Sequence, residues 1–148
     1  MLFSDGPMGI EKYYLYADFL SDDISSADFK TLNGKRIGVL IGAKPEAMLN
    51  EWELKNGLKT IHINIKSKED TLAKLENGEI DCFISLEEPF WADKGVSIIT
   101  RIGKSNIYFA INKDHPEIKK ELDLVMHQLE EERPFYMSDL YRQYFCLL

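Results

Sequence analysis

The chain has 148 residues, of which 45% are hydrophobic and 29% are charged, and its formal net charge is -7 at pH 7. This length suits one ordinary domain that buries a real core. The acidic charge is dispersed along the chain, which argues against a nucleic-acid surface and against docking on an anionic membrane.

The N-terminus and the cysteines limit the setting further. No stretch is long and apolar enough to span a bilayer, and the first residues have neither the basic region nor the apolar core of a signal peptide. Two interpretations are open: a cytoplasmic protein, or a chain that begins inside a longer one. Cys82 and Cys146 are expected to be separate free thiols. Because His62, His115 and His127 are scattered, we expect no metal site and no cofactor.

The first half of the chain alternates between expected strands and helices. Residues 8–19 are rich in aromatic and β-favouring residues that alternate between two faces, which predicts an extended strand. A short helical turn is expected at 27–32. Residues 36–41 predict a buried strand, and Pro45 then begins a helix that ends near Lys55.

The middle of the chain continues this α/β pattern. Residues 60–65 alternate as a strand, and Ser67 then caps a helix that ends at Gly78. Two further strands are expected at 80–85 and 96–100. Strands separated by helices of this length imply crossover connections and a largely parallel sheet.

The last third of the chain is an extended segment at 105–112 followed by helices. Apolar residues at helical spacing give the first of these helices one apolar face. They are Ile118, Leu122, Val125, Met126 and Leu129. A last short helix is expected at 139–145. The apolar face needs a covering surface, and a homodimer that buries it is one expected partner.

Four short segments resemble those of a known family. They are 3–7 (FSDGP), 32–39 (LNGKRIGV), 75–82 (LENGEIDC) and 105–111 (SNIYFAI). In this order they resemble the first crossover, the opening strand of the second lobe, a helix-to-strand joint and the return crossover of the family 3 extracellular solute-binding proteins. These bilobed proteins have the type II periplasmic-binding-protein fold and close on amino acids and similar polar solutes.

This resemblance implies a fold and an organisation. The fold class is α/β: a periplasmic-binding-protein-like lobe with a mostly parallel sheet flanked by helices, two crossover strands and a C-terminal helical tail. Residues 1–34 would form the first crossover strand and a connector, and residues 35–104 the second lobe. Residues 105–148 would form the return crossover and the C-terminal helices of a truncated first lobe.

The resemblance also implies a ligand site with departures from the family pattern. Ala43 lacks the hydroxyl that the family usually places in its carboxylate-binding loop, and Leu86 stands where the family has a second acid. Asp81 matches an acid that is usually structural. Phe90 and Trp91 would either form an apolar platform at the cleft edge or cap the core. The candidate ligand-binding residues are Ser4, Tyr14, Gly42, Ala43, Lys44, Ser85 and Glu87.

A small polar solute, amino-acid-like or an organic anion, is the partner that the resemblance implies. The segment 13–16 (YYLY) is similar to versions of this domain fused to membrane-anchored histidine kinases or diguanylate cyclases. We therefore expect an extracytoplasmic sensor domain whose link to the membrane is its tethered full-length protein. Two alternatives are open: the soluble receptor of an ABC-type amino-acid transporter, and a ligand-free dimerisation module. The sequence has no nucleophile elbow, catalytic-triad order or phosphate loop, so no enzymatic activity is expected.

Overall fold

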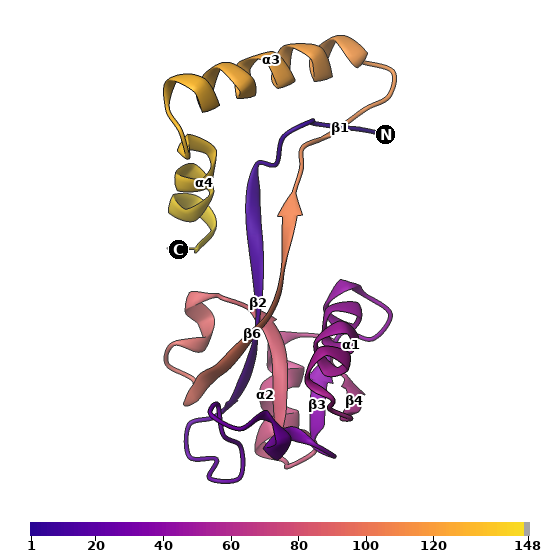
Figure 1. The fold of residues 1–148 in the computed structure, drawn as a ribbon, viewed down its shortest axis with the longest axis vertical. Coiled ribbons are helices and arrows are strands. Elements are labelled where there is room, and N and C mark those ends of the chain that lie inside the picture. Colours follow the sequence, from indigo (N-terminus) through magenta and orange to yellow (C-terminus); the bar gives the residue numbers. More distant parts are fainter. Residues whose placement is uncertain (147–148) are drawn as a thin grey trace. The chain divides into compact units, whose positions relative to one another are not determined.

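A computed structural model of the chain describes residues 1–146 (Figure 1). The strands are β1 (Leu2–Phe3), β2 (Gly9–Asp18), β3 (Arg36–Val39), β4 (Ile61–Asn64), β5 (Cys82–Leu86), β6 (Val96–Ile107) and β7 (Ala110–Ile111). The α-helices are α1 (Lys44–Asn56), α2 (Lys68–Glu76), α3 (Pro116–Glu132) and α4 (Tyr136–Tyr141). Short 3-10 helices η1 (Phe29–Leu32) and η2 (Pro89–Trp91) and a π-helix (Arg142–Cys146) complete the described chain.

Five strands form one mixed sheet in the order β4-β3-β5-β2-β6. The strands of the α/β region, β3 with β4 and β3 with β5, pair in parallel as predicted, since a helix connects each strand to the next. Strand β2 pairs antiparallel with β5. The predicted fold class, an α/β lobe with a helix-flanked sheet, is confirmed.

Alternation along the central strands gives the sheet two buried faces. One face packs against α1, where Leu49 and Trp52 are buried, and includes Leu15 and Ala17 of β2. The other face packs against α2 and η2 around a fully buried ring, that of Phe83. Its further members are Tyr16, Ile80 and Trp91, with Tyr14, Ile63, Leu72, Leu75, Phe90 and Val96 packed around them. Trp91 therefore caps the core, which decides between the two predicted roles.

Two expected strand boundaries are wrong. The strands predicted at 96–100 and 105–112 are joined in β6, a single strand of 12 residues, and only the short β7 follows it. Strand β3 ends at Val39, so Leu40 and Ile41 leave the predicted buried strand and are about half exposed, at 48% and 47%.

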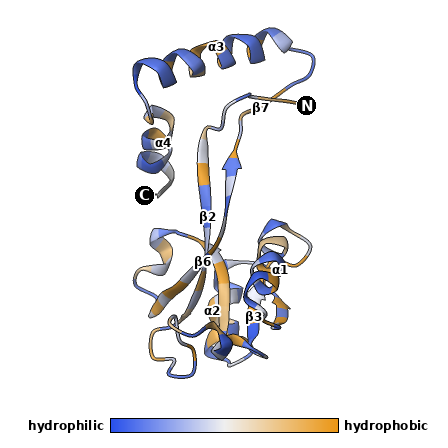
Figure 2. Cartoon of the chain, viewed as in Figure 1, coloured by the Kyte–Doolittle hydropathy of each residue, from blue (hydrophilic) through white to orange (hydrophobic). Residues whose placement is uncertain are grey.

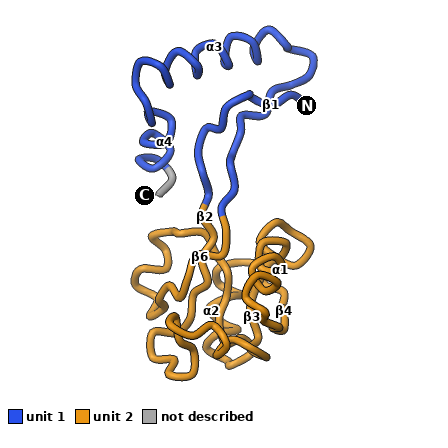
Figure 3. Tube along the Cα trace, in the orientation of Figure 1, with its two compact units in different colours: residues 1–11, 104–148 blue, residues 12–103 orange. Residues whose placement is uncertain are grey.

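The chain divides into two compact units (Figure 3). Unit 1 comprises residues 1–11 and 104–148, and unit 2 comprises residues 12–103. Both β2 and β6 contribute residues to each unit. The first predicted segment, 1–34, is thus divided between the units.

In unit 1, β1 and β7 form an antiparallel pair that packs against α3. Figure 2 shows α3 as mostly hydrophilic with apolar residues interspersed. One of these, Met126, is buried and lies against Gly6. Ile118 and Val125 remain 49% exposed, so part of the predicted apolar face is open, and its burial in a homodimer stays a prediction.

The C-terminal helices begin where the backbone changes direction. After Pro134, Phe135 has a φ of +69°, an αL conformation that separates α3 from α4. The helix predicted at 139–145 is divided between α4 and the π-helix. Cys82 is buried and free, as predicted, whereas the side chain of Cys146 lies outside the described part of the chain.

Candidate functional site

The candidate site lies at the carboxyl edge of β3 and β5 in unit 2. In open α/β sheets, ligands bind outside the carboxyl ends of the parallel strands, where successive connections leave toward opposite faces. The connection after β3 enters α1 on one face, and the connection after β5 enters η2 on the other face. The register pairs Gly38 with Phe83, so the residues that follow both strands emerge at the same edge.

Three predicted residues gather where β5 meets β2. Tyr14 and Ser85 are direct cross-strand partners, and Glu87 follows the end of β5. The Glu87 carboxylate lies close enough to the Tyr14 hydroxyl to raise its pKa, although burial raises it more. The Ser85 hydroxyl accepts a hydrogen bond from Trp91 Nε1 at 3.0 Å, which fixes its orientation and leaves its own proton to donate. The structure therefore brings Tyr14, Ser85 and Glu87 together, as their assignment to one site requires.

Burial and negative charge act together on the two tyrosines at this edge. Burial raises the pKa of Tyr14, and the Glu87 carboxylate raises it further, while Arg101 opposes the shift. Burial, followed by the Glu87 carboxylate, raises the pKa of Tyr16 to about 12. Both hydroxyls are therefore neutral hydrogen-bond donors at neutral pH, and neither acts as a base. Glu88, the next acid, forms an ion pair with Lys68.

The loop from Gly42 to Lys44 forms the second part of the edge. Gly42 has a φ of +80°, which favours glycine. Ala43 is the N-cap of α1 and makes no side-chain capping bond, in line with its missing hydroxyl. Lys44 is exposed at the first turn of α1, and the half-exposed Leu40 and Ile41 precede the loop.

Ser4, the remaining predicted residue, belongs to unit 1 and is 4% exposed. Its hydroxyl donates to the Gly6 carbonyl at 2.8 Å and accepts from the Phe109 amide at 3.1 Å. Its own amide donates to the Phe109 carbonyl at 3.0 Å. These bonds hold the turn after β1 against the segment before β7, which gives Ser4 a structural role within unit 1.

A histidine site beside the loop was missed in the sequence. His62 of β4 lies between two α1 carboxylates, with its Nδ1 3.0 Å from Glu46 Oε2 and its Nε2 3.0 Å from Glu53 Oε1. The signal was present in the spacing, because residues 46 and 53 are seven apart and share one helix face. Glu46 Oε1 also accepts a hydrogen bond from the Gly42 amide at 3.2 Å.

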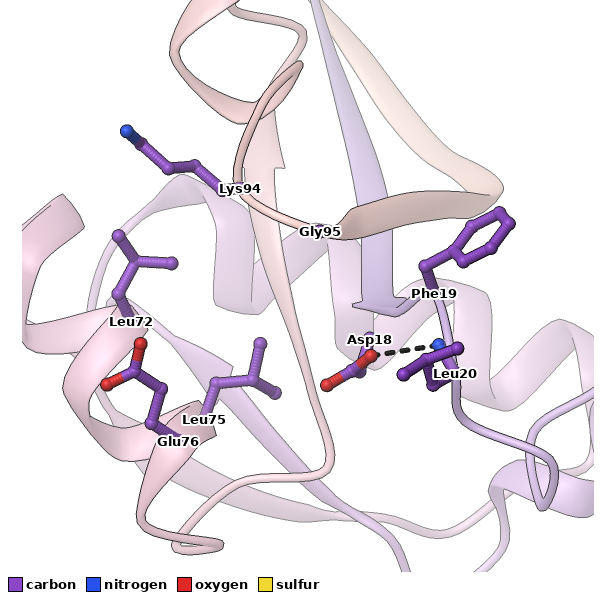
Figure 4. A pocket seen from close by; sticks show the side chains of 8 residues that line it. All are labelled: Asp18, Phe19, Leu20, Leu72, Leu75, Glu76, Lys94 and Gly95. Carbon is purple, nitrogen blue, oxygen red and sulfur yellow. Dashed lines mark hydrogen bonds between the residues drawn. The ribbon is translucent and has the colours of Figure 1, made fainter.

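A pocket of about 410 Å³ lies elsewhere in unit 2 (Figure 4). In Figure 4, Leu72, Leu75 and Glu76 of α2 face a second side formed by Asp18 and Leu20. Asp18 ends β2, which runs antiparallel to β5, so this pocket is at the opposite edge of the sheet from Glu87. It contains none of the predicted ligand-binding residues.

The described residues include neither a metal-binding cluster nor a membrane-spanning helix. Within residues 1–146, no group of three or more His, Cys, Asp or Glu side chains is placed to hold a metal ion. None of the helices described here combines the length and apolar character needed to cross a bilayer.

Comparisons with known proteins place the fold. No family model matches the chain, and no curated protein matches it. Solved structures do. A probable amino-acid ABC transporter extracellular-binding protein, ytmK from Bacillus subtilis, has a TM-score of 0.77 and 16% identity, over 99% of this chain and 64% of that chain. A putative L-cystine ABC transporter protein from Listeria monocytogenes has a TM-score of 0.67 and 18% identity, over 99% and 63%.

A third structure is an ancestral amino acid-binding protein described as a precursor of cyclohexadienyl dehydratase. It has a TM-score of 0.66 and 19% identity, over 97% of this chain and 61% of that chain. This chain thus spans less than two thirds of the length of all three. The chain has the periplasmic-binding-protein fold found in the solute-binding proteins of bacterial amino-acid ABC transporters.

Proposed function

We propose that this chain binds a small polar solute, amino-acid-like or an organic anion, at the carboxyl edge of β3 and β5. The observation that carries the proposal is the convergence of Tyr14, Ser85 and Glu87 with the loop before α1 at one edge of this fold. Hydrogen-bond donors and a carboxylate at the same edge suit a solute with both an anionic and a cationic group.

Each residue has a distinct role in this proposal. Glu87 is exposed and binds the cationic group, although it stands one position beyond the family's usual acid. Lys44 and the Gly42 amide, once Glu46 releases that amide, bind the anionic group at the start of α1. The Ala43 amide donates to the Leu40 carbonyl at 3.4 Å and completes the turn. Tyr14 places a neutral hydroxyl beside the Glu87 carboxylate. Ser85 donates its hydroxyl proton, and Leu40 and Ile41 supply apolar contact.

The setting that we propose is an extracytoplasmic sensor domain of a membrane-anchored signalling protein, such as a histidine kinase or a diguanylate cyclase. Residues 35–104 would be its second lobe, residues 1–34 the first crossover strand and a connector, and residues 105–148 the return crossover strand and the C-terminal helices of a truncated first lobe. A second candidate is the soluble receptor of an amino-acid transporter, supported by the printed names of two of the similar structures.

A thermal-shift panel of the twenty amino acids and small carboxylates tests the proposed binding. A ligand at about 100 times its Kd stabilises the folded state by about 2.7 kcal/mol, which raises Tm by roughly 5–11 °C at this size. Replacing Glu87 with glutamine should remove most of that rise. The matched control is Glu76→Gln, an exposed acid in the pocket at the other edge, which should leave it unchanged.

Three outcomes separate the alternatives. No response from this chain or from the full-length protein rejects the proposal and leaves the ligand-free dimerisation module. An equal loss in both variants rejects the site. Where binding is found, a kinase or cyclase domain on the same polypeptide supports the sensor, and a free-standing gene product supports the transporter receptor.

A further inference from the structure

The histidine site beside the candidate loop is unusually well defined. Glu46 and Glu53 lie on one face of α1, and the His62 side chain, which is 16% exposed, lies between them on β4. Both ring nitrogens are 3.0 Å from a carboxylate oxygen. The Thr60 hydroxyl donates to the same Glu53 oxygen. These are the charged and titratable groups that face the ring from α1 and from the segment before β4.

The two carboxylate partners require His62 to be positively charged in this arrangement. A carboxylate only accepts hydrogen bonds, so both ring nitrogens must donate, which requires the imidazolium form. A neutral imidazole has one N–H and keeps only one of the two bonds. Burial lowers the pKa of His62, but the hydrogen bonds to Glu53 and Glu46 outweigh burial, and the pKa is raised above 6.5.

Glu46 connects this histidine to the loop. While Oε2 faces His62, Oε1 accepts from the Gly42 amide at 3.2 Å. His62 and then the Gly42 amide lower the pKa of Glu46, so its carboxylate stays charged. As long as Glu46 holds this position, the Gly42 amide is occupied within the protein and is withheld from a bound solute.

Helix α2 provides an internal comparison. There Asp70 accepts from the Lys66 amide at 2.9 Å, at the same place relative to the helix start as Glu46 at α1. The other Asp70 oxygen is paired with Lys74 at 2.6 Å. An acid bonded to the amide before a helix is therefore an ordinary cap in this chain. The specific feature of α1 is that the partner of its acid is a histidine, which loses its charge at a lower pH than a lysine does.

We propose that His62 is a positioning residue that makes the Gly42–Lys44 loop respond to pH. Cationic His62 holds Glu46 on the Gly42 amide, and neutral His62 releases Glu46, so that the amide becomes available to the anionic group of a solute. The consequence for binding rests on the proposed function, whereas the release of the amide does not.

Amide NMR of the full chain between about pH 5 and about pH 9 tests the release, because this range spans the histidine titration. We expect the Gly42 resonance to titrate with the His62 ring midpoint, above 6.5. The Lys66 resonance should stay constant in the same spectra, since the partner of Asp70 is a lysine. A Gly42 resonance that ignores the His62 titration would overturn the proposal.

Variants separate His62 from other titrating groups. His62→Gln, which is neutral throughout, should abolish the Gly42 titration. Glu46→Gln should also abolish it, because it removes the carboxylate that lies between the His62 ring and the Gly42 amide. The matched control is His127→Gln, whose histidine pairs with Glu131 on the exposed surface of α3 and should not affect Gly42. Persistence of the titration in both His62→Gln and Glu46→Gln refutes the coupling. If His62→Gln fails to fold, Glu46→Gln and the wild-type titration still decide.

The effect of His62 on solute binding is tested by measuring Kd as a function of pH. For a carboxylate solute found in the thermal-shift panel, one additional amide bond should tighten Kd by about three- to tenfold as pH rises through the His62 midpoint. The change should be absent in His62→Gln. A solute that binds with no such dependence, while Gly42 titrates, rejects the regulation of binding. If no compound in the thermal-shift panel raises Tm, the proposed function is rejected. The NMR experiment alone then decides whether the charge of His62 is coupled to the Gly42 amide.

Discussion

Replacing Asp81 with alanine removes the acceptor that joins the start of β3 to the segment before β5. Its carboxylate accepts from the Arg36 amide at 2.8 Å, from Arg36 Nε at 3.2 Å and from an Arg36 terminal nitrogen at 2.9 Å. A hydrogen bond to a charged group contributes about 1.5–3 kcal/mol. Because the side chains are 25% and 41% exposed, solvent screening reduces the sum, and we expect a loss of about 2–3 kcal/mol.

This loss should lower Tm by roughly 4–12 °C and reduce the denaturant midpoint without changing the slope m. Circular dichroism during urea unfolding measures both. The matched control is Asp23→Ala, which removes an ion pair with Lys35 from a 63% exposed carboxylate and should cost less than about 0.5 kcal/mol. If both variants lose the same free energy of unfolding, geometry and burial do not make the Arg36–Asp81 pair more stabilising than the Lys35–Asp23 pair, which refutes this reasoning.

The pH dependence supplies a second check on the same residue. The Arg36 guanidinium holds the pKa of Asp81 below its ordinary value of 3.8. A lowered pKa gives a stabilisation that is complete above the unfolded value and is lost as pH falls through the folded one. The difference between wild type and Asp81→Ala should therefore be constant near neutral pH and shrink below about pH 4.

Three further predictions concern packing. Phe83 is fully buried and stacks on Tyr16 with ring centroids 5.3 Å apart, so Phe83→Ala should cost about 3–5 kcal/mol in urea unfolding, and a loss below about 1 kcal/mol would contradict this. Burial raises the pKa of the Cys82 thiol to about 12, so in a Cys146→Ser background iodoacetamide should label it only after unfolding; rapid labelling of the folded chain would show the thiol to be accessible. A Cβ added at Gly9 would lie 2.5 Å from the ring of Tyr141, so Gly9→Ala should speed hydrogen exchange in α4, and unchanged protection there would show that the ring does not pack on Gly9.

Alternation along the chain correctly predicted the two faces of β2. In β2, Leu15 and Ala17 face the α1 side while Tyr14 and Tyr16 face the α2 side, as a period of two requires. Helix starts were equally visible, because a serine cap or an N-terminal proline acts within one turn. Ser67 accepts from the Asp70 amide at 3.0 Å, and Pro45 is in the first turn of α1.

The joined strand β6 shows where local sequence patterns fail. Gly103 lies between the two predicted strands and resembles a break, since glycine often ends a strand. In the fold its missing side chain serves packing: a Cβ there would lie 3.0 Å from Met48 Sδ of α1. That contact joins residues 55 positions apart, so nothing within a local window distinguishes it from a turn.

The same limit applies to the candidate site. Which polar side chains are already bonded depends on partners distant in sequence. The Ser4 hydroxyl accepts from the Phe109 amide, and the His62 ring nitrogens lie against Glu46 and Glu53 of the preceding helix. The resemblance to the solute-binding family, and not residue type or spacing, identified Tyr14, Ser85 and Glu87 as candidates. Only the antiparallel register of β2 with β5 brings Tyr14 opposite Ser85.

Backbone direction, more than the shape of the surface, selects the candidate edge. The pocket of about 410 Å³ lies beyond the end of β2, at the edge where β5 begins. The Gly42 loop and Glu87 lie at the other edge, where β3 and β5 end and α1 begins. At the start of α1 the Gly42 amide donates to Glu46, so an anionic solute at this edge would compete with that carboxylate for the same donor. Under our two proposals, the Glu46–Gly42 bond is thus part of the free-energy cost of binding at this edge, and the charge of His62 sets how large that cost is.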